Sequence, residues 1–129
     1  MTTLEQPAAQ IDPEKLEQFV FRAVDEIGAT LNTALVVMGD KLGLYQALAG
    51  AGPLTPVELA RRTGVAERYV REWLNAQAAG GYVEYDADSG RYTLPPEQAA
   101  ALTDTDSPAY IAGFFQIALG SVLDSPHIT

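Results

Sequence analysis

Apolar residues recur at steps of three and four along the first third of the chain, after a polar start over residues 1–12. Asp12 is a good capping residue, Pro13 suits the first helical position and Glu14 suits the first turn, so a helix is predicted to begin here. At 100° per residue the repeating positions fall within about 60° of one line. They are Leu16, Val20, Ala23, Val24, Ile27, Leu31, Ala34, Leu35 and Met38.

The apolar surface of this helix is broader than one face. Phe19 and Val37 lie on one shoulder of the stripe and Phe21 lies on the other. A chain of this size has little else to cover such a surface, so a homodimer is predicted. The predicted interface comprises Phe19, Phe21, Val24, Leu31, Leu35 and Val37.

Gly39-Asp40 predicts a break or a kink, followed by a further helical segment with Leu42, Tyr45 and Leu48 facing inward. That segment ends in a loop of small residues, Gly50-Ala51-Gly52-Pro53. The Gly-x-Gly in this loop does not indicate a nucleotide site. It follows a helix rather than a strand, and Pro53 removes an N–H donor that such a loop would use.

Residues 54–94 carry the pattern of a winged helix-turn-helix. Thr55 and Glu58 form a capping box around Pro56, and the helix is expected to run to Thr63 and stop at Gly64. A second helix is predicted from Glu67 to Ala79, after the poor cap Ala66, with its inward face formed by Val70, Trp73, Leu74, Gln77 and Ala78. Two short β-rich runs, 82–85 and 91–94, then flank a turn at residues 86–90 and predict a hairpin. The predicted fold is mainly α with a small β-hairpin wing: a winged helix-turn-helix with extra N- and C-terminal helices.

The last part of the chain predicts a short helix over Glu97–Leu102, a polar link, and a helix that starts at Ser107-Pro108. Residues 107–123 contain no charged side chain. A membrane span, an ordinary core helix and a helix buried by a partner or a further domain are the alternatives. The run contains Ser, Gln, Pro and two Gly, and its apolar residues lie nearly all the way round, so the third is favoured. Tyr110, Phe114 and Phe115 are the predicted inter-domain contacts.

Composition excludes most catalytic chemistry. The 129 residues suffice for one domain, and 47% apolar with 19% charged residues is typical of a globular protein. No signal peptide is indicated at the N-terminus, so a cytoplasmic location is expected. The absence of cysteine removes disulfides, thiolate catalysis and thiolate metal ligands, and the single histidine, His127, is expected on the surface. No catalytic, metal-binding or cofactor-binding residue is therefore predicted.

The net charge of −9 argues against nucleic acid as a partner, because phosphate contacts need basic residues. A DNA-binding regulator nevertheless stays open as an alternative, with contacts from Arg61, Arg62, Arg68, Arg71 and Asn75. Glu67 with Arg71, and Arg68 with Glu72, are spaced to form ion pairs that neutralise this helix face. The wing holds three acids, Glu84, Asp86 and Asp88, against Arg91.

The runs "GDKLGLYQAL" and "ERYVREWLNAQAAGGYVEYDADSGRYTLPPEQAAALT" resemble the N-terminal region of a class I S-adenosylmethionine-dependent methyltransferase family of bacterial, often actinomycete, enzymes. The resemblance extends from about Phe19 to Leu123; Ala66 departs from it, where Ser or Thr is expected as a helix cap. In such enzymes the winged-helix domain pairs two protomers and walls the acceptor pocket, and a following Rossmann-like domain holds the cofactor. The resemblance thus implies methyl transfer by a longer protein and S-adenosylmethionine as its cofactor.

The expected organisation is a flexible arm over 1–12, a winged-helix dimerisation domain over 13–102, and a linker helix over 103–129 that leads toward a catalytic domain. This chain alone is expected to be inactive and to bind no S-adenosylmethionine. Its expected partners are a second copy and the catalytic domain, the latter covalently attached or separately encoded. No membrane partner is expected.

Overall fold

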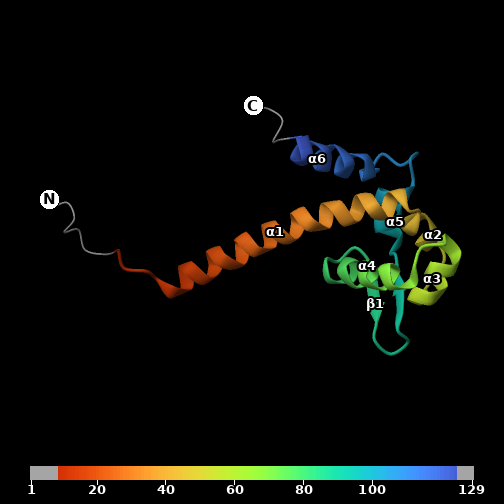
Figure 1. The fold of residues 1–129 in the computed structure, drawn as a ribbon, viewed down its shortest axis with the longest axis horizontal. Helices are drawn as coiled ribbons and strands as arrows, with labels where there is room; N and C mark the ends of the chain where they lie inside the picture. Colours follow the sequence, from red (N-terminus) through yellow and green to blue (C-terminus); the bar gives the residue numbers. More distant parts are fainter. Residues whose placement is uncertain (1–8, 125–129) are drawn as a thin grey trace. The chain divides into compact units, whose positions relative to one another are not determined.

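The computed structural model describes residues 9–124, which form six helices and one two-stranded hairpin (Figure 1). The elements are α1 (Pro13–Lys41), α2 (Leu44–Leu48), α3 (Pro56–Thr63), α4 (Glu67–Ala79), β1 (Glu84–Asp86), β2 (Arg91–Thr93), α5 (Pro96–Thr103) and α6 (Ala112–Asp124). The chain divides into two compact units between Thr30 and Leu31. The predicted winged helix-turn-helix with extra terminal helices is confirmed. Most of the predicted arm, residues 1–8, and His127 lie outside the described residues.

The helix α1 begins where the sequence predicts, because Asp12 Oδ1 accepts a hydrogen bond of 2.9 Å from the Glu14 N–H. The predicted break at Gly39-Asp40 is wrong. The helix continues through Gly39 to Lys41, and the chain turns at Leu42-Gly43, where Gly43 has φ +74°. Gly39 is buried beside an aromatic ring, and a Cβ added to it would lie 2.4 Å from Trp73 Cζ2. Its missing side chain lets α1 approach α4 rather than ending the helix.

The core of the second unit lies between the last turns of α1 and the helices α2 to α5. Its buried apolar side chains are Val36, Leu44, Tyr45, Leu48, Leu54, Leu59, Val70, Trp73, Leu74, Val83, Tyr92, Leu94 and Leu102. The side chain of Gln77 is also buried and links two helices to its own, since it accepts a hydrogen bond from the Tyr45 hydroxyl and donates one of 3.1 Å to Asn32 Oδ1. Burial raises the pKa of Tyr45, so its hydroxyl stays protonated and serves as a donor.

The helix-turn-helix follows its local sequence signals. Thr55 Oγ1 accepts a hydrogen bond of 3.2 Å from the Glu58 N–H, and Glu58 Oε1 accepts one of 2.9 Å from the Thr55 N–H. The capping box predicted for α3 is therefore confirmed. Gly64 ends α3 with φ +74°. The inward face of α4 is buried at Val70, Trp73, Leu74 and Gln77, as predicted, and Ala78 is half-buried.

The wing is a short antiparallel hairpin in which Tyr85 pairs with Tyr92. Leu54 forms a bridge to the hairpin, because its N–H and carbonyl exchange hydrogen bonds of 2.9 and 2.8 Å with Tyr92. The segment before α3 thus holds the wing against the helix-turn-helix.

The end of the described chain departs from prediction at Ser107-Pro108. The short helix α5 is confirmed, but α6 begins at Ala112 rather than at Ser107. The Ser107 hydroxyl accepts a hydrogen bond of 3.1 Å from the Ala109 N–H in a local turn, and the Ile111 N–H donates one of 2.9 Å to the Ala101 carbonyl. These bonds tie residues 107–111 to α5 and delay the start of the helix.

Candidate functional site

Three surfaces of this protein come into question as functional sites: the outer face of α4 with the wing, the apolar face of α1, and the apolar face of α6. Among residues 9–124, no three His, Cys, Asp or Glu side chains are grouped in a way that could hold a metal ion. Within the same range, none of the helices combines the length and hydropathy that crossing a bilayer requires. The three surfaces therefore have to be judged by what they can contact.

The outer face of α4 is occupied by ion pairs within the helix. Arg71 contacts Glu67, and Arg68 Nε lies 3.6 Å from Glu72 Oε1. Both pairs predicted from the i, i+4 spacing are confirmed. They are solvent-exposed and add little to stability, but each acid neutralises a cation that a phosphate would need.

The remaining residues proposed for DNA contact are divided. Asn75 Oδ1 accepts a hydrogen bond from the Tyr92 hydroxyl, so its side chain is engaged with β2. Arg61 and Arg62 are exposed in the last turn of α3 and have no ion pair within the described residues. Two adjacent free cations are a small electrostatic footprint for a DNA reader.

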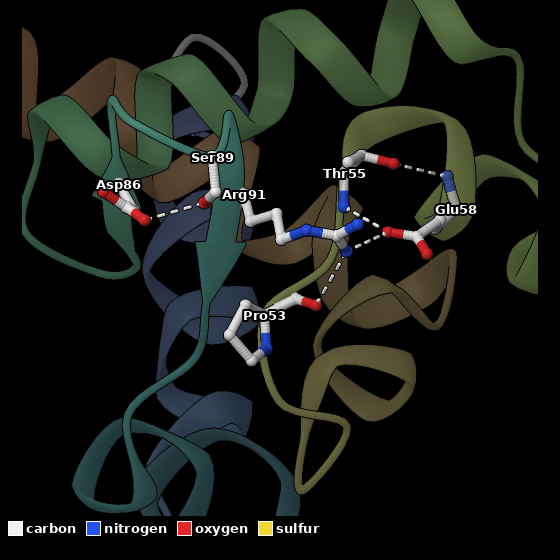
Figure 2. Close-up of polar contacts among 6 residues, drawn as sticks. All are labelled: Pro53, Thr55, Glu58, Asp86, Ser89 and Arg91. Atoms are coloured by element: carbon white, nitrogen blue, oxygen red, sulfur yellow. Dashed lines mark hydrogen bonds and ion pairs between the residues drawn. The ribbon is translucent and has the colours of Figure 1, made fainter.

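The wing turns its single arginine inward. Arg91 Nη1 lies 2.6 Å from Glu58 Oε1 and 3.4 Å from the Pro53 carbonyl, as Figure 2 shows. The Thr55 N–H, with the nearby Arg91 guanidinium, holds the pKa of Glu58 below its usual range. Hydrogen bonds from the Ser89 hydroxyl and from backbone N–H groups likewise lower the pKa of Asp86. The wing therefore presents ionised acids outward, which disfavours contact with phosphate.

The apolar face of α1 changes character along the helix. Phe19, Phe21, Val24 and Leu31 of the predicted dimer interface are exposed, with more than half of each residue's surface accessible. Leu35 is half-buried, and its carbonyl accepts a hydrogen bond of 2.9 Å from Trp73 Nε1. The expectation that Val37 lies on an outer shoulder is wrong. It is only 6% exposed, because the C-terminal turns of α1 belong to the core of the second unit.

The apolar face of α6 surrounds a hollow of about 190 Å³, which we call the α6 hollow. It is lined by Tyr110, Gly113, Phe114 and Ile117. Sequence reasoning named Tyr110 and Phe114 but missed the other two, although the spacing i, i+3, i+4, i+7 is that of one helix face. Phe115 points elsewhere, since its ring packs edge-on against Tyr82 at 6.2 Å between centroids. It contributes to the protein's own packing.

Residues 29–104 match the family model of the Rv2258c-like winged HTH domain. The match covers more than half of the chain, and the protein belongs to this family. A comparison with curated protein sequences found no match.

Solved methyltransferase structures share this fold. CalO1, the methyltransferase in calicheamicin biosynthesis, in its S-adenosylhomocysteine-bound form, is 27% identical with a TM-score of 0.58, over 78% of this chain and 28% of its own. An O-methyltransferase family protein from Burkholderia thailandensis is 19% identical with a TM-score of 0.62, over 93% and 32%. Human N-acetylserotonin methyltransferase in complex with S-adenosylmethionine is 16% identical with a TM-score of 0.63, over 95% and 36%. The chain spans about a third of the length of these proteins.

Proposed function

We propose that this chain is the N-terminal winged-helix domain of an S-adenosylmethionine-dependent methyltransferase that acts on small molecules. It serves there as a dimerisation element and as a cap over the acceptor substrate. A domain outside this chain binds the cofactor and carries out methyl transfer. The observation that carries the proposal is the α6 hollow, an uncovered apolar surface on a fold shared with methyltransferases.

The chemistry of the α6 hollow supports a capping role. Phe114 and Ile117 are each about two-thirds exposed. Large exposed apolar groups cost solvation free energy and mark contact surfaces. The lining offers rings and aliphatic side chains but no charged group, so it suits the carbon skeleton of an acceptor or the apolar surface of a catalytic domain.

The charge distribution supports this proposal over the DNA-binding alternative. The two arginines of α4 are paired with acids, and the one arginine of the wing faces α3. A regulator would need these cations free, because counterion release supplies most of its affinity.

Calorimetric titration of S-adenosylmethionine tests the proposal on two proteins. The chain of residues 1–129 is expected to give no binding heat, whereas the complete natural protein is expected to bind with a Kd on the order of micromolar. Cofactor binding by residues 1–129 would contradict the assignment of the cofactor to another domain. Absence of binding by the complete protein would contradict the methyltransferase itself.

Fluorescence anisotropy with duplex DNA provides the second arm. We expect no binding tighter than about 10⁻⁴ M at roughly 150 mM salt, the weak end of non-specific affinity. Salt-dependent binding that is lost in an Arg61→Ala, Arg62→Ala variant would instead favour a regulator.

A further inference from the structure

The exposed part of α1 has the size of a protein interface. Seven large apolar side chains between Leu16 and Leu31 are 47–67% exposed; they are Leu16, Phe19, Val20, Phe21, Val24, Ile27 and Leu31. With roughly 200 Å² for each fully exposed side chain, they present on the order of 800 Å² of apolar surface, which is the area one partner contributes to a standard interface. The first unit of the chain has no core of its own that could cover it.

We infer that a second copy of this chain covers this surface, with the two α1 helices antiparallel and a two-fold axis between Ala23 and Val24. This inference rests on the proposed dimerisation role and specifies its geometry. A two-fold pair is isologous, so the same stripe must be complementary to its own reversed copy. The exposed stripe meets that condition when all of it overlaps.

The register follows from where the exposed stripe begins and ends. Leu16 then faces the partner's Leu31, and Val20 faces the partner's Ile27. At 100° per residue these four side chains lie within about 30° of the contact line. Ala23 and Val24 flank the axis, about 50° to either side of that line. A shift by one helical turn keeps the same face but leaves Leu16 or Leu31 without an opposite residue.

The charges on α1 favour a second copy over a lipid surface. Between Pro13 and Leu31 the helix carries four acids and two bases; they are Glu14, Glu17, Asp25, Glu26, Lys15 and Arg22. Helices that lie on anionic membranes carry lysine and arginine on their polar face. Here Arg22 is also paired with Glu26, at 3.5 Å between Nε and Oε1, within its own helix.

Disulfide cross-linking tests the register directly, since the chain has no native cysteine. In Ala23→Cys the two Cα atoms lie about 5–7 Å apart across packed helices, within disulfide range. In Leu16→Cys the axial separation of the two copies is about 22 Å, from fifteen residues at 1.5 Å each, and no bond can form. Leu31→Cys behaves in the same way. A mixture of Leu16→Cys and Leu31→Cys proteins is expected to cross-link, because those positions face each other.

The experiment uses the 129-residue chain under mild oxidation, with Gln18→Cys on the opposite side of the helix as the control. Ala23→Cys is expected to convert more than half of the protein to a covalent dimer, and the single variants Leu16→Cys, Leu31→Cys and Gln18→Cys less than a tenth. Self-linking by Leu16→Cys as efficient as by Ala23→Cys would indicate parallel helices and overturn the inference. A dimer by light scattering in which Ala23→Cys does not cross-link would overturn the register but leave dimerisation standing. A monomer at about 100 μM would overturn both. Circular dichroism of each variant establishes that the fold is kept.

Discussion

Substitution of Gly39 by alanine tests the structural account of α1 most sharply. The added methyl group would lie 2.4 Å from Trp73 Cζ2 and 2.9 Å from Tyr45 Cε2. Neither ring can withdraw without breaking a bond. Trp73 Nε1 donates to the Leu35 carbonyl at 2.9 Å, and the Tyr45 hydroxyl donates to Gln77. The two rings also pack edge-on against each other, with centroids 5.0 Å apart.

The net effect is the difference of two terms. Overpacking a core costs about 1–3 kcal/mol, and loss of the Trp73 hydrogen bond adds about 1 kcal/mol. Alanine in a helix interior returns about 1 kcal/mol relative to glycine. The expected loss in free energy of unfolding is therefore about 2 kcal/mol, or roughly 8–16 °C in Tm for a domain of this size.

Gly28→Ala is the matched control, since it lies in the same helix and its added Cβ meets no atom within 4 Å. It is expected to raise stability by about 0.5–1 kcal/mol. Thermal unfolding by circular dichroism gives the Tm values, and the fluorescence of Trp73, the only tryptophan, reports the local contact. If Gly39→Ala were as stable as Gly28→Ala, the close packing of α1 on α4 would be refuted.

Three further predictions concern the wing and the two apolar faces. Because the pKa of Glu58 is lowered in the folded state, its contribution to stability is present above about pH 4.3 and is lost as the pH falls through the folded value. The Tm advantage of the wild type over Glu58→Gln should thus shrink as the pH is lowered from about 5 to below 4, and a pH-independent difference would count against the Arg91 ion pair. Ile27→Glu should shift the dimer to monomer in light scattering, whereas Gln18→Glu should not, since only Ile27 lies in the apolar stripe of α1. Phe114→Ala should change the free energy of unfolding of this chain by less than about 0.5 kcal/mol, as expected at an exposed site, but lower acceptor turnover by the complete protein; a large loss of stability would place Phe114 in the core.

Local signals in the sequence were sufficient wherever the interacting atoms are close in the chain. The capping box of Thr55 and Glu58 spans three residues, and Gly64 ends α3 through its own backbone freedom. The ion pairs of α4 span four residues. The wing follows from alternation and turn composition, although its strands are shorter than the predicted runs. These elements, and the helix-turn-helix they make, follow from the sequence.

Sequence reasoning failed where the decisive neighbour is distant in the chain. Ser107-Pro108 has the composition of a helix start, but the Ile111 N–H bonds to Ala101, and the helix begins later. Arg91 reads as a wing cation, yet it reaches Glu58, 33 residues away. In each case a local preference worth about 1 kcal/mol is outweighed by a tertiary contact.

The sequence by itself determined the helical periods, the caps and the turn of the winged helix, because these depend on atoms within about one helical turn. Only the tertiary structure decided that Gly39 is a contact point rather than a break and that Val37 is core. It also decided that the stripe of α1 divides into a buried and an exposed part. An amphipathic pattern specifies that a face will be covered, but it does not specify by what. That depends on which elements meet in space, here Gly39 with Trp73 across more than thirty residues.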